Sequence, residues 1–279
     1  MITSQKTKDL AGQLLSRIFP ELITHMSLPG IEIHRCYDEY GPIRVFEDGT
    51  HRYLAFSEDS QQSAIDLADP SRPVFHYIQA MLLSLLYVPS PRKVTLLGLG
   101  GGSLVQTLRK YDSQMEMTVV ELRQQVHAVA RNYFELPEDP LIQIHIGDAD
   151  DYIASLSSKT QKPSDLIFID IYSDEGMNDI QLSLPFLEHC FHHLSASGML
   201  ILNLWDQGKG SHPKAKQALS EVFEGNALAC PVEDGNLIVF AFKGGMPLIN
   251  QRHLQPFAKR LSKKLVFPVY ERLQAIRPL

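Results

Sequence analysis

The chain of 279 residues is 44% hydrophobic and 21% charged, with a formal net charge of −6 at pH 7. This is the composition of a globular protein with a full core, and the acidic balance argues against nucleic acid as the main ligand. No apolar run approaches the ~20 residues of a membrane span, and the first ten residues lack the apolar stretch of a signal peptide. We therefore expect a cytoplasmic protein with no membrane partner. The three cysteines form no CxxC pair, which indicates free thiols and no metal site.

The first 73 residues predict a helix followed by a small β unit. Between residues 5 and 25, apolar side chains recur four apart, the spacing of an amphipathic helix. Residues 31–56 contain three short alternating segments, separated by the turn sequences Tyr40-Gly-Pro and Glu47-Asp-Gly. Residues 57–73 are polar and are expected to form a connection. We take residues 1–73 as the first of three units.

Residues 74–245 alternate between helical and strand patterns and make the second unit. Helices are expected at 74–86, 103–111, 122–134, 150–157, 179–194 and 214–223, and strands at 94–97, 115–121, 141–146, 165–170 and 198–204. This alternation predicts an α/β fold with a Rossmann-like, mainly parallel sheet and right-handed crossovers. Segments 227–232 and 236–242 flank the turn Glu233-Asp-Gly and predict a closing antiparallel hairpin.

The third unit, residues 246–279, is expected to be helical over 249–276. It contains the basic run Lys259-Arg-Leu-Ser-Lys-Lys264. On an acidic chain we interpret this run as a solvated helix face in preference to a nucleic-acid contact.

A glycine cluster follows the strand at 94–97 and opens the helix at 103. Glycines at 98, 100, 101 and 102 allow a sharp turn where a Cβ would collide with a ligand, and they aim backbone N–H groups at it. We expect Gly98, Gly100 and Gly102 to bind a nucleotide-like ligand; the alternative is a tight strand–helix turn alone. The dinucleotide fingerprint has a third glycine where this chain has Ser103.

Three further strand ends carry acids. Glu121 lies 21 residues beyond Gly100, where a carboxylate can accept both ribose hydroxyls. Asp148 follows the strand at 141–146 and can accept from an adenine amino group, while Ala149 leaves room for the ring. Asp170 ends the strand at 165–170. Because ligands of open α/β sheets bind beyond the carboxyl ends of the strands, we expect all these residues to share one site.

These elements, in this order over residues 30–245, resemble the polyamine aminopropyltransferases, the spermidine synthase family. The matching features are a glutamine before the first helix of the second unit (Gln61 or Gln62, of which we select Gln62), Pro91-Arg-Lys-Val94 before the glycine loop, Glu121, Gly147-Asp148, and Asp170 with its acidic loop. The resemblance implies a class I AdoMet methyltransferase-like fold with an N-terminal β extension. It also implies that Glu121 holds ribose, that Asp148 holds adenine and that Asp170 helps deprotonate the attacking amine.

The chain departs from the family at several positions. The acid of the family's Gly-Gly-Gly-Asp-Gly-Gly loop, which binds the donor's aminopropyl amine, aligns with Gly101. The family's Asp-Ser-Ser-Asp-Pro becomes Asp170-Ile-Tyr-Ser-Asp174, and its tyrosine before the buried helix falls at His76 or Tyr77.

Aminopropyl transfer needs anions to hold a cationic amine and a carboxylate to take its proton. The cluster of acids beyond the fourth strand suits this, with Asp170 as the base, Asp174 as a second acid and Tyr172 orienting the amine. Trp205 and His76 are interpreted as packing residues. The expected function is transfer of an aminopropyl group from decarboxylated AdoMet to a polyamine or related small-molecule amine, with release of methylthioadenosine. The expected donor is decarboxylated AdoMet or AdoMet, and no metal is expected. A methyltransferase and a catalytically silent nucleoside binder are the alternatives, and a homodimer is one option for assembly.

Overall fold

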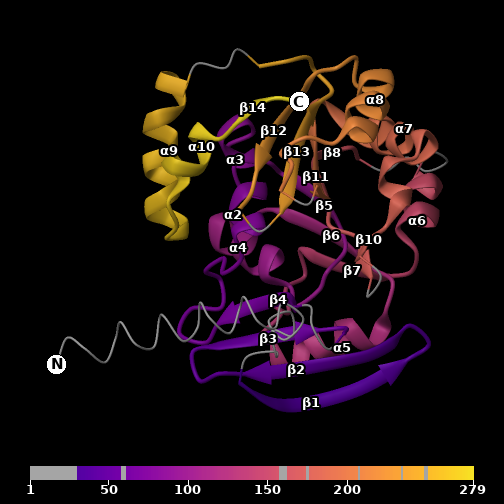
Figure 1. Ribbon diagram of the computed structural model, residues 1–279, viewed down its shortest axis with the longest axis vertical. Helices are drawn as coiled ribbons and strands as arrows, with labels where there is room; N and C mark the ends of the chain where they lie inside the picture. The colour runs from indigo at the N-terminus through magenta and orange to yellow at the C-terminus, as the bar shows by residue number, and fades with distance from the viewer. Residues whose placement is uncertain are drawn as a thin grey trace, which may run out of the picture.

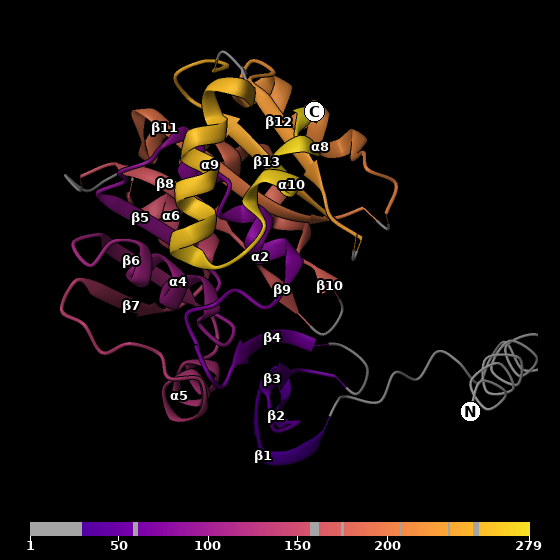
Figure 2. The same cartoon turned by 90° about the vertical axis from the view of Figure 1, so that its left-hand side faces the viewer.

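The computed structural model describes residues 30–57, 61–156, 162–173, 176–206, 208–233, 235–247 and 251–279. The helix expected within residues 5–25 lies outside these residues, as does Asp174. Figures 1 and 2 show a small sheet, β1 to β4, below a large sheet with helices on both of its faces. In the described part of the chain, no helix combines the length and apolarity needed to cross a bilayer.

The small sheet is an antiparallel meander in the order β1-β2-β3-β4. Its strands are β1 (Ile31–Asp38), β2 (Gly41–Glu47), β3 (His51–Ala55) and β4 (Gln61–Asp66). The first three confirm the predicted β unit. The fourth corrects our prediction of a polar connection: the polar start of β4 concealed a strand that buries Ser63, Ala64 and Ile65.

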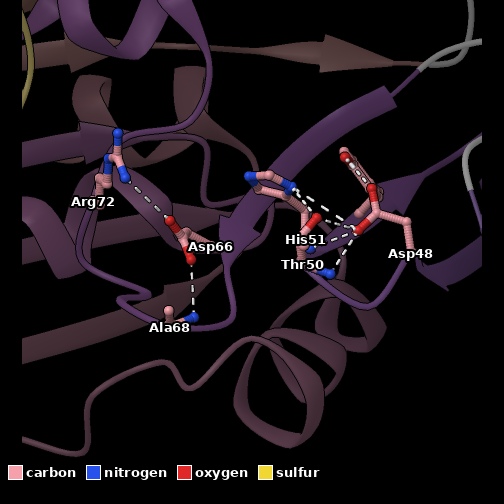
Figure 3. Close-up of polar contacts among 7 residues, drawn as sticks. Asp48, Thr50, His51, Asp66, Ala68 and Arg72 are labelled. Carbon is pink, nitrogen blue, oxygen red and sulfur yellow. Dashed lines mark hydrogen bonds and ion pairs between the residues drawn. The ribbon is translucent and has the colours of Figure 1, made fainter.

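Polar side chains fix the turns of this sheet (Figure 3). The Asp48 carboxylate accepts from the backbone N–H groups of Thr50 at 2.8 Å and His51 at 2.7 Å, which closes the β2–β3 turn. These hydrogen bonds hold the pKa of Asp48 below its usual range. After β4, Asp66 accepts from the Ala68 N–H at 2.9 Å and pairs with Arg72 at 3.5 Å. The polar composition of this region therefore stabilises turns as well as connecting strands.

The large sheet has the order β14-β12-β13-β11-β8-β5-β6-β7. Its strands are β5 (Lys93–Leu97), β6 (Glu116–Glu121), β7 (Ile142–Ile146), β8 (Ser164–Ile169), β11 (Leu194–Trp205), β12 (Ala227–Pro231), β13 (Asn236–Phe242) and β14 (Arg277–Pro278). Strands β7, β6, β5, β8 and β11 are parallel, and β13, β12 and β14 are antiparallel. The predicted fold class, a mainly parallel Rossmann-like sheet with a closing hairpin, is confirmed.

Helices cover both faces of this sheet. They are α2 (His76–Met81), α3 (Ser84–Tyr87), α4 (Ser103–Tyr111), α5 (Gln124–Tyr133), α6 (Ala149–Leu156), η2 (Asp179–Leu182), α7 (Leu184–His193), α8 (Pro213–Val222), α9 (Gln251–Leu265) and α10 (Val269–Gln274). One hydrophobic core contains α2, α3, α4, α9 and α10, and the other contains α6, α7 and α8 (Figure 1). Helix α5 contributes Ala130 to the first of these cores and packs Val126 and Val129, with Phe134 just beyond its end, against the small sheet.

Three expected helices are divided in the structure. The helix at 74–86 becomes α2 and α3, joined where the Leu83 N–H bonds to the Ala80 carbonyl three residues back. The helix at 179–194 becomes η2 and α7, because Ser183 caps a new helix ahead of Pro185. The expected C-terminal helix becomes α9 and α10: α9 ends at Leu265, where Val266 takes the left-handed conformation with φ +58°, and α10 begins after Pro268 and is followed by strand β14.

Candidate active site

A cavity of about 750 Å³ lies beyond the carboxyl ends of β5, β6 and β8, between the two sheets. Its lining includes eight of the ten residues predicted for the site: Gln62, Gly98, Gly100, Glu121, Asp148, Ala149, Asp170 and Tyr172. Gly102 does not line it, and Asp174 is outside the described residues. Residues scattered over more than a hundred positions are thus brought together at one edge of the parallel sheet.

The glycine loop needs its glycines for different reasons. Gly98 has φ +103°, and a Cβ there would lie 2.2 Å from the Asp170 carbonyl oxygen. This contact joins the loop closely to the end of β8. Gly102, at φ +80°, occupies the N-cap of α4 in the left-handed conformation. Its contribution is therefore to the path of the backbone.

Gly101 is packed against the small sheet and has no space for a side chain. A Cβ at Gly101 would lie 2.8 Å from Ser63 Oγ and 2.9 Å from Phe134 Cδ1. Ser63 belongs to β4, and Phe134 ends α5. The space beside the loop is therefore filled by these two elements, and an acid at position 101 would require both to move.

Glu121 is almost enclosed, with 8% of its surface exposed. Its carboxylate accepts from the Leu99 N–H at 3.1 Å and from the Arg123 N–H at 2.9 Å. Burial raises the pKa of Glu121, while these backbone donors and the Arg123 charge act against the rise. The side chain is held rigidly across the end of β6, beside the glycine loop.

Asp148 and Gln62 border the same cavity from opposite sides. Asp148 Oδ1 accepts from the N–H groups of Asp150 at 2.7 Å and Asp151 at 3.2 Å, so it caps α6 while it lines the cavity. Gln62 comes from β4, and its backbone carbonyl oxygen lies 3.3 Å from the Tyr77 hydroxyl.

Asp170 lies in a network of polar side chains. Its Oδ1 accepts from Asn203 Nδ2 at 2.8 Å, and the Tyr77 hydroxyl also hydrogen-bonds its carboxyl group. Burial raises the pKa of Asp170 to about 6, against the opposing effect of the Asn203 and Tyr77 hydrogen bonds. The carboxyl group can therefore exchange a proton near neutral pH.

Tyr172 and Trp205 complete this side of the cavity. The Tyr172 hydroxyl donates to the Asn203 carbonyl at 3.3 Å, and burial raises the pKa of Tyr172 well above its usual value. Trp205, which we interpreted as a packing residue with a wall of the pocket as the alternative, is 47% exposed and lines the cavity. Its ring lies so close to Gly235 that a Cβ there would be 2.9 Å away. His76, also expected in the core, is partly exposed and lies 3.4 Å from Glu233.

Sequence reasoning missed Asn203 and Asn236 as site residues. Both line the cavity. Asn203 was visible as the one polar side chain in the apolar run Met199–Leu204, a signal that we did not use.

The cavity has an anionic lining. Its acids within the described residues are Glu39, Glu121, Asp148, Asp150 and Asp170. One basic residue, Arg123, lines the same described part, and its guanidinium pairs with Asp38 at 2.7 Å. The cavity is thus suited to a cationic ligand. Among the described residues, no three acids, histidines or cysteines are grouped so as to hold a metal ion.

Comparison with known proteins identifies the family of the chain. The family model of the spermine/spermidine synthase domain matches residues 76–251. A polyamine aminopropyltransferase of Neisseria meningitidis is 34% identical over 223 residues, which cover 79% of this chain and 83% of the relative.

Two solved structures share the fold. A probable spermidine synthase of Corynebacterium glutamicum has a TM-score of 0.68 at 21% identity, covering 86% of this chain and 88% of its own. Human methyltransferase-like protein 13, in complex with SAH, has a TM-score of 0.61 at 24% identity, covering 70% of this chain and 94% of its own. On the family model and the Neisseria relative together, the chain belongs to the spermine/spermidine synthase family.

Proposed function

We propose that the protein transfers an aminopropyl group from decarboxylated AdoMet to a small-molecule amine and releases methylthioadenosine. The observation that carries this proposal is Asp170, whose raised pKa of about 6 and place in an anionic cavity suit a base that acts on a cationic amine. The similarity to the polyamine aminopropyltransferase of Neisseria meningitidis supports it.

The nucleoside half of the donor would lie against the glycine loop. Glu121 would accept from the ribose hydroxyls, and Asp148 would accept from the adenine amino group beside Ala149. Gly98 and Gly100 would let the backbone approach the ligand closely. Gln62 would border the ligand from the small sheet, which would therefore form part of the donor site.

In the reaction, the amine nitrogen attacks the donor carbon next to the sulfonium. A C–N bond forms, and the C–S bond breaks with its electron pair going to sulfur, which leaves as a neutral thioether. Asp170 accepts the proton that the amine must lose, with Asn203 and Tyr77 holding its carboxyl group. Tyr172 would orient the amine, and Asp174 is proposed as a second anion for it.

Replacing Asp170 by Asn tests the proposal. The variant keeps the size of the side chain and an acceptor for Asn203, but it cannot take a proton. Single-turnover transfer to putrescine should slow by about 10²–10⁴-fold, while the affinity for methylthioadenosine, measured by calorimetry, stays unchanged.

Asp151→Asn is the matched control, because Asp151 lies on the exposed face of α6 and does not line the cavity. Its rate should remain close to that of the wild type. Equal rates in the wild type and Asp170→Asn would remove Asp170 as the base. If mass spectrometry detected a methylated amine as the product, the reaction would be methyl transfer and the proposal of aminopropyl transfer would be wrong.

A further inference from the structure

Two buried asparagines stand behind Asp170 in otherwise apolar strands. Asn203 in β11 is 2% exposed and Asn236 in β13 is 9% exposed. Burying an amide is unfavourable unless its hydrogen bonds are made within the protein. Asn203 Nδ2 donates to Asp170 Oδ1 at 2.8 Å, and Asn236 Nδ2 donates to Asn203 Oδ1 at 2.8 Å. The two amides therefore form a chain that ends on the carboxyl group of Asp170.

The direction of this chain matters for the charge on Asp170. An amide group can rotate by half a turn with little change in shape, and Asn203 would then present its oxygen to the carboxylate. The donor from Asn236 opposes that rotation, because it needs the Asn203 oxygen on its own side. Asn236 thus selects the orientation in which Asn203 donates to Asp170.

The same pair also holds Tyr172. The Tyr172 hydroxyl donates to the Asn203 backbone carbonyl at 3.3 Å and is hydrogen-bonded by the Asn236 side chain. Strand pairing fixes the two asparagines relative to each other, since Asn203 pairs with Ile238 and Asn236 with Trp205 in the antiparallel register of β11 and β13. The closing hairpin of the sheet therefore reaches the centre of the cavity through one side chain.

We propose that Asn236 is a positioning residue, which acts through Asn203 to orient and keep ionised the carboxyl group of Asp170. The assignment of Asp170 as the base rests on the proposed function, whereas the amide chain itself does not. A direct measurement of the Asp170 carboxyl group can therefore separate the two.

Two substitutions at position 236 test the direction of the chain. Asn236→Leu removes the donor and frees Asn203 to rotate. Asn236→Asp places carboxylate acceptors opposite the Asn203 side chain. The Asn203 amide should then rotate, so that Nδ2 faces residue 236 and Oδ1 faces Asp170. The Asp170 pKa, followed by ¹³C NMR of the carboxyl carbon, should rise in both variants. We expect the pKa of Asp170 to rise by about one unit in Asn236→Leu, which is a tenfold change in the protonation equilibrium, and by more in Asn236→Asp.

A double-variant comparison shows whether Asn236 acts through Asn203. In an Asn203→Leu background, Asn236→Leu should have no further effect on the Asp170 pKa. Asn226→Leu is the control, since the Asn226 amide donates to the Phe223 carbonyl at 2.9 Å and does not line the cavity. Methylthioadenosine affinity reports whether each variant is folded.

An Asp170 pKa that is unchanged in Asn236→Leu and Asn236→Asp would overturn the proposal. So would an Asn236→Leu substitution that changes the Asp170 pKa equally in the wild-type and Asn203→Leu backgrounds. If the pKa rises, the acid limb of the pH–rate profile should move with it. A pKa that moves without the rate profile would support the amide chain and contradict Asp170 as the base.

Discussion

On the proposed function, Glu121 should contribute strongly to nucleoside affinity, because an enclosed carboxylate forms strong hydrogen bonds. Replacing it by Ala should weaken methylthioadenosine binding by roughly 2–4 kcal/mol, as two charge-assisted hydrogen bonds are lost. Since burial raises the pKa of Glu121, wild-type affinity should also decline as the pH falls through that raised value. Calorimetry of Glu121→Ala measures the loss. The control is Glu116→Ala, at the exposed start of the same strand. An unchanged affinity in the first variant would exclude Glu121 from the site.

Gly101 bears on donor choice. If decarboxylated AdoMet is the donor, as proposed, its terminal amine would lack the acid that the resemblance to the family implies at this position. In competition assays, the protein should therefore prefer decarboxylated AdoMet to AdoMet by less than about a hundredfold, or ~2.7 kcal/mol. Gly101→Asp should not restore selectivity, because its side chain would displace Ser63 and Phe134 and destabilise the fold by about 1–3 kcal/mol. A strong preference in the wild type would mean that another acid holds the amine.

At the level of elements, one ion pair joins the small sheet to the donor site. Asp38 of β1 and Arg123 pair at 2.7 Å with both side chains 8% exposed, and Arg123 also donates to the Gly41 carbonyl at 2.9 Å. The Arg123 N–H holds Glu121. Arg123→Met leaves the buried Asp38 carboxylate unpaired, so the free energy of unfolding should fall by about 3–5 kcal/mol. Methylthioadenosine should also bind more weakly.

Urea denaturation and calorimetry measure both effects of the Arg123 variant. Adding Asp38→Asn to Arg123→Met should restore part of the stability, because the uncompensated charge is then removed. Arg35→Met serves as control, since Arg35 pairs with Glu32 on the exposed face of the same sheet, where solvent screens the pair and its loss should change stability little. Additive losses from Arg123→Met and Asp38→Asn would show that the two side chains are not coupled.

The elements that the sequence predicted well are those with long, periodic apolar patterns. Buried parallel strands such as β5 and β8 are continuous apolar runs, and their carboxyl ends meet at one edge whatever the loops do. This is why Gly98, Glu121 and Asp170 could be assigned to one cavity. The misses have local causes: β4 begins with polar residues, and the two-residue β14 is too short for any period.

The partners of Asp170 could not be predicted in the same way. Asn203 reaches Asp170 because β11 lies beside β8, and Asn236 reaches Asn203 because β13 pairs with β11 in one particular register. The register between strands that are distant in sequence depends on the packing of the whole sheet, so it cannot be predicted from the sequence of either strand alone. The same holds for Trp205, whose exposure depends on the position of Gly235.

For the whole molecule, the site has a cost in stability that depends on pH. Burial raises the pKa of Asp170 to about 6 in the folded state, whereas an unfolded chain has an aspartate pKa of about 3.9. Between these values the folded state binds more protons than the unfolded state, so stability falls as the pH rises. A shift of about two units corresponds to about 3 kcal/mol, lost mainly between about pH 4 and pH 6 and constant above.

Asp170→Asn removes this dependence, because the amide stays neutral at every pH. At pH 4 the two proteins should unfold at similar urea concentrations, since Asp170 is then mostly protonated in the folded wild type. At pH 7 to 8 the free energy of unfolding of the variant should exceed that of the wild type by up to about 3 kcal/mol. Weaker hydrogen bonds at residue 170 in the variant would reduce this difference. Urea titrations at several pH values measure the difference in the free energy of unfolding, in which the contributions of the other titrating groups cancel. A difference that stays constant with pH would show that the Asp170 carboxyl group titrates normally. A variant that became less stable than the wild type as the pH rose would show that the charged form of Asp170 stabilises the fold. The expected result, a slower but more stable enzyme, would identify Asp170 as a group retained for chemistry at the expense of stability.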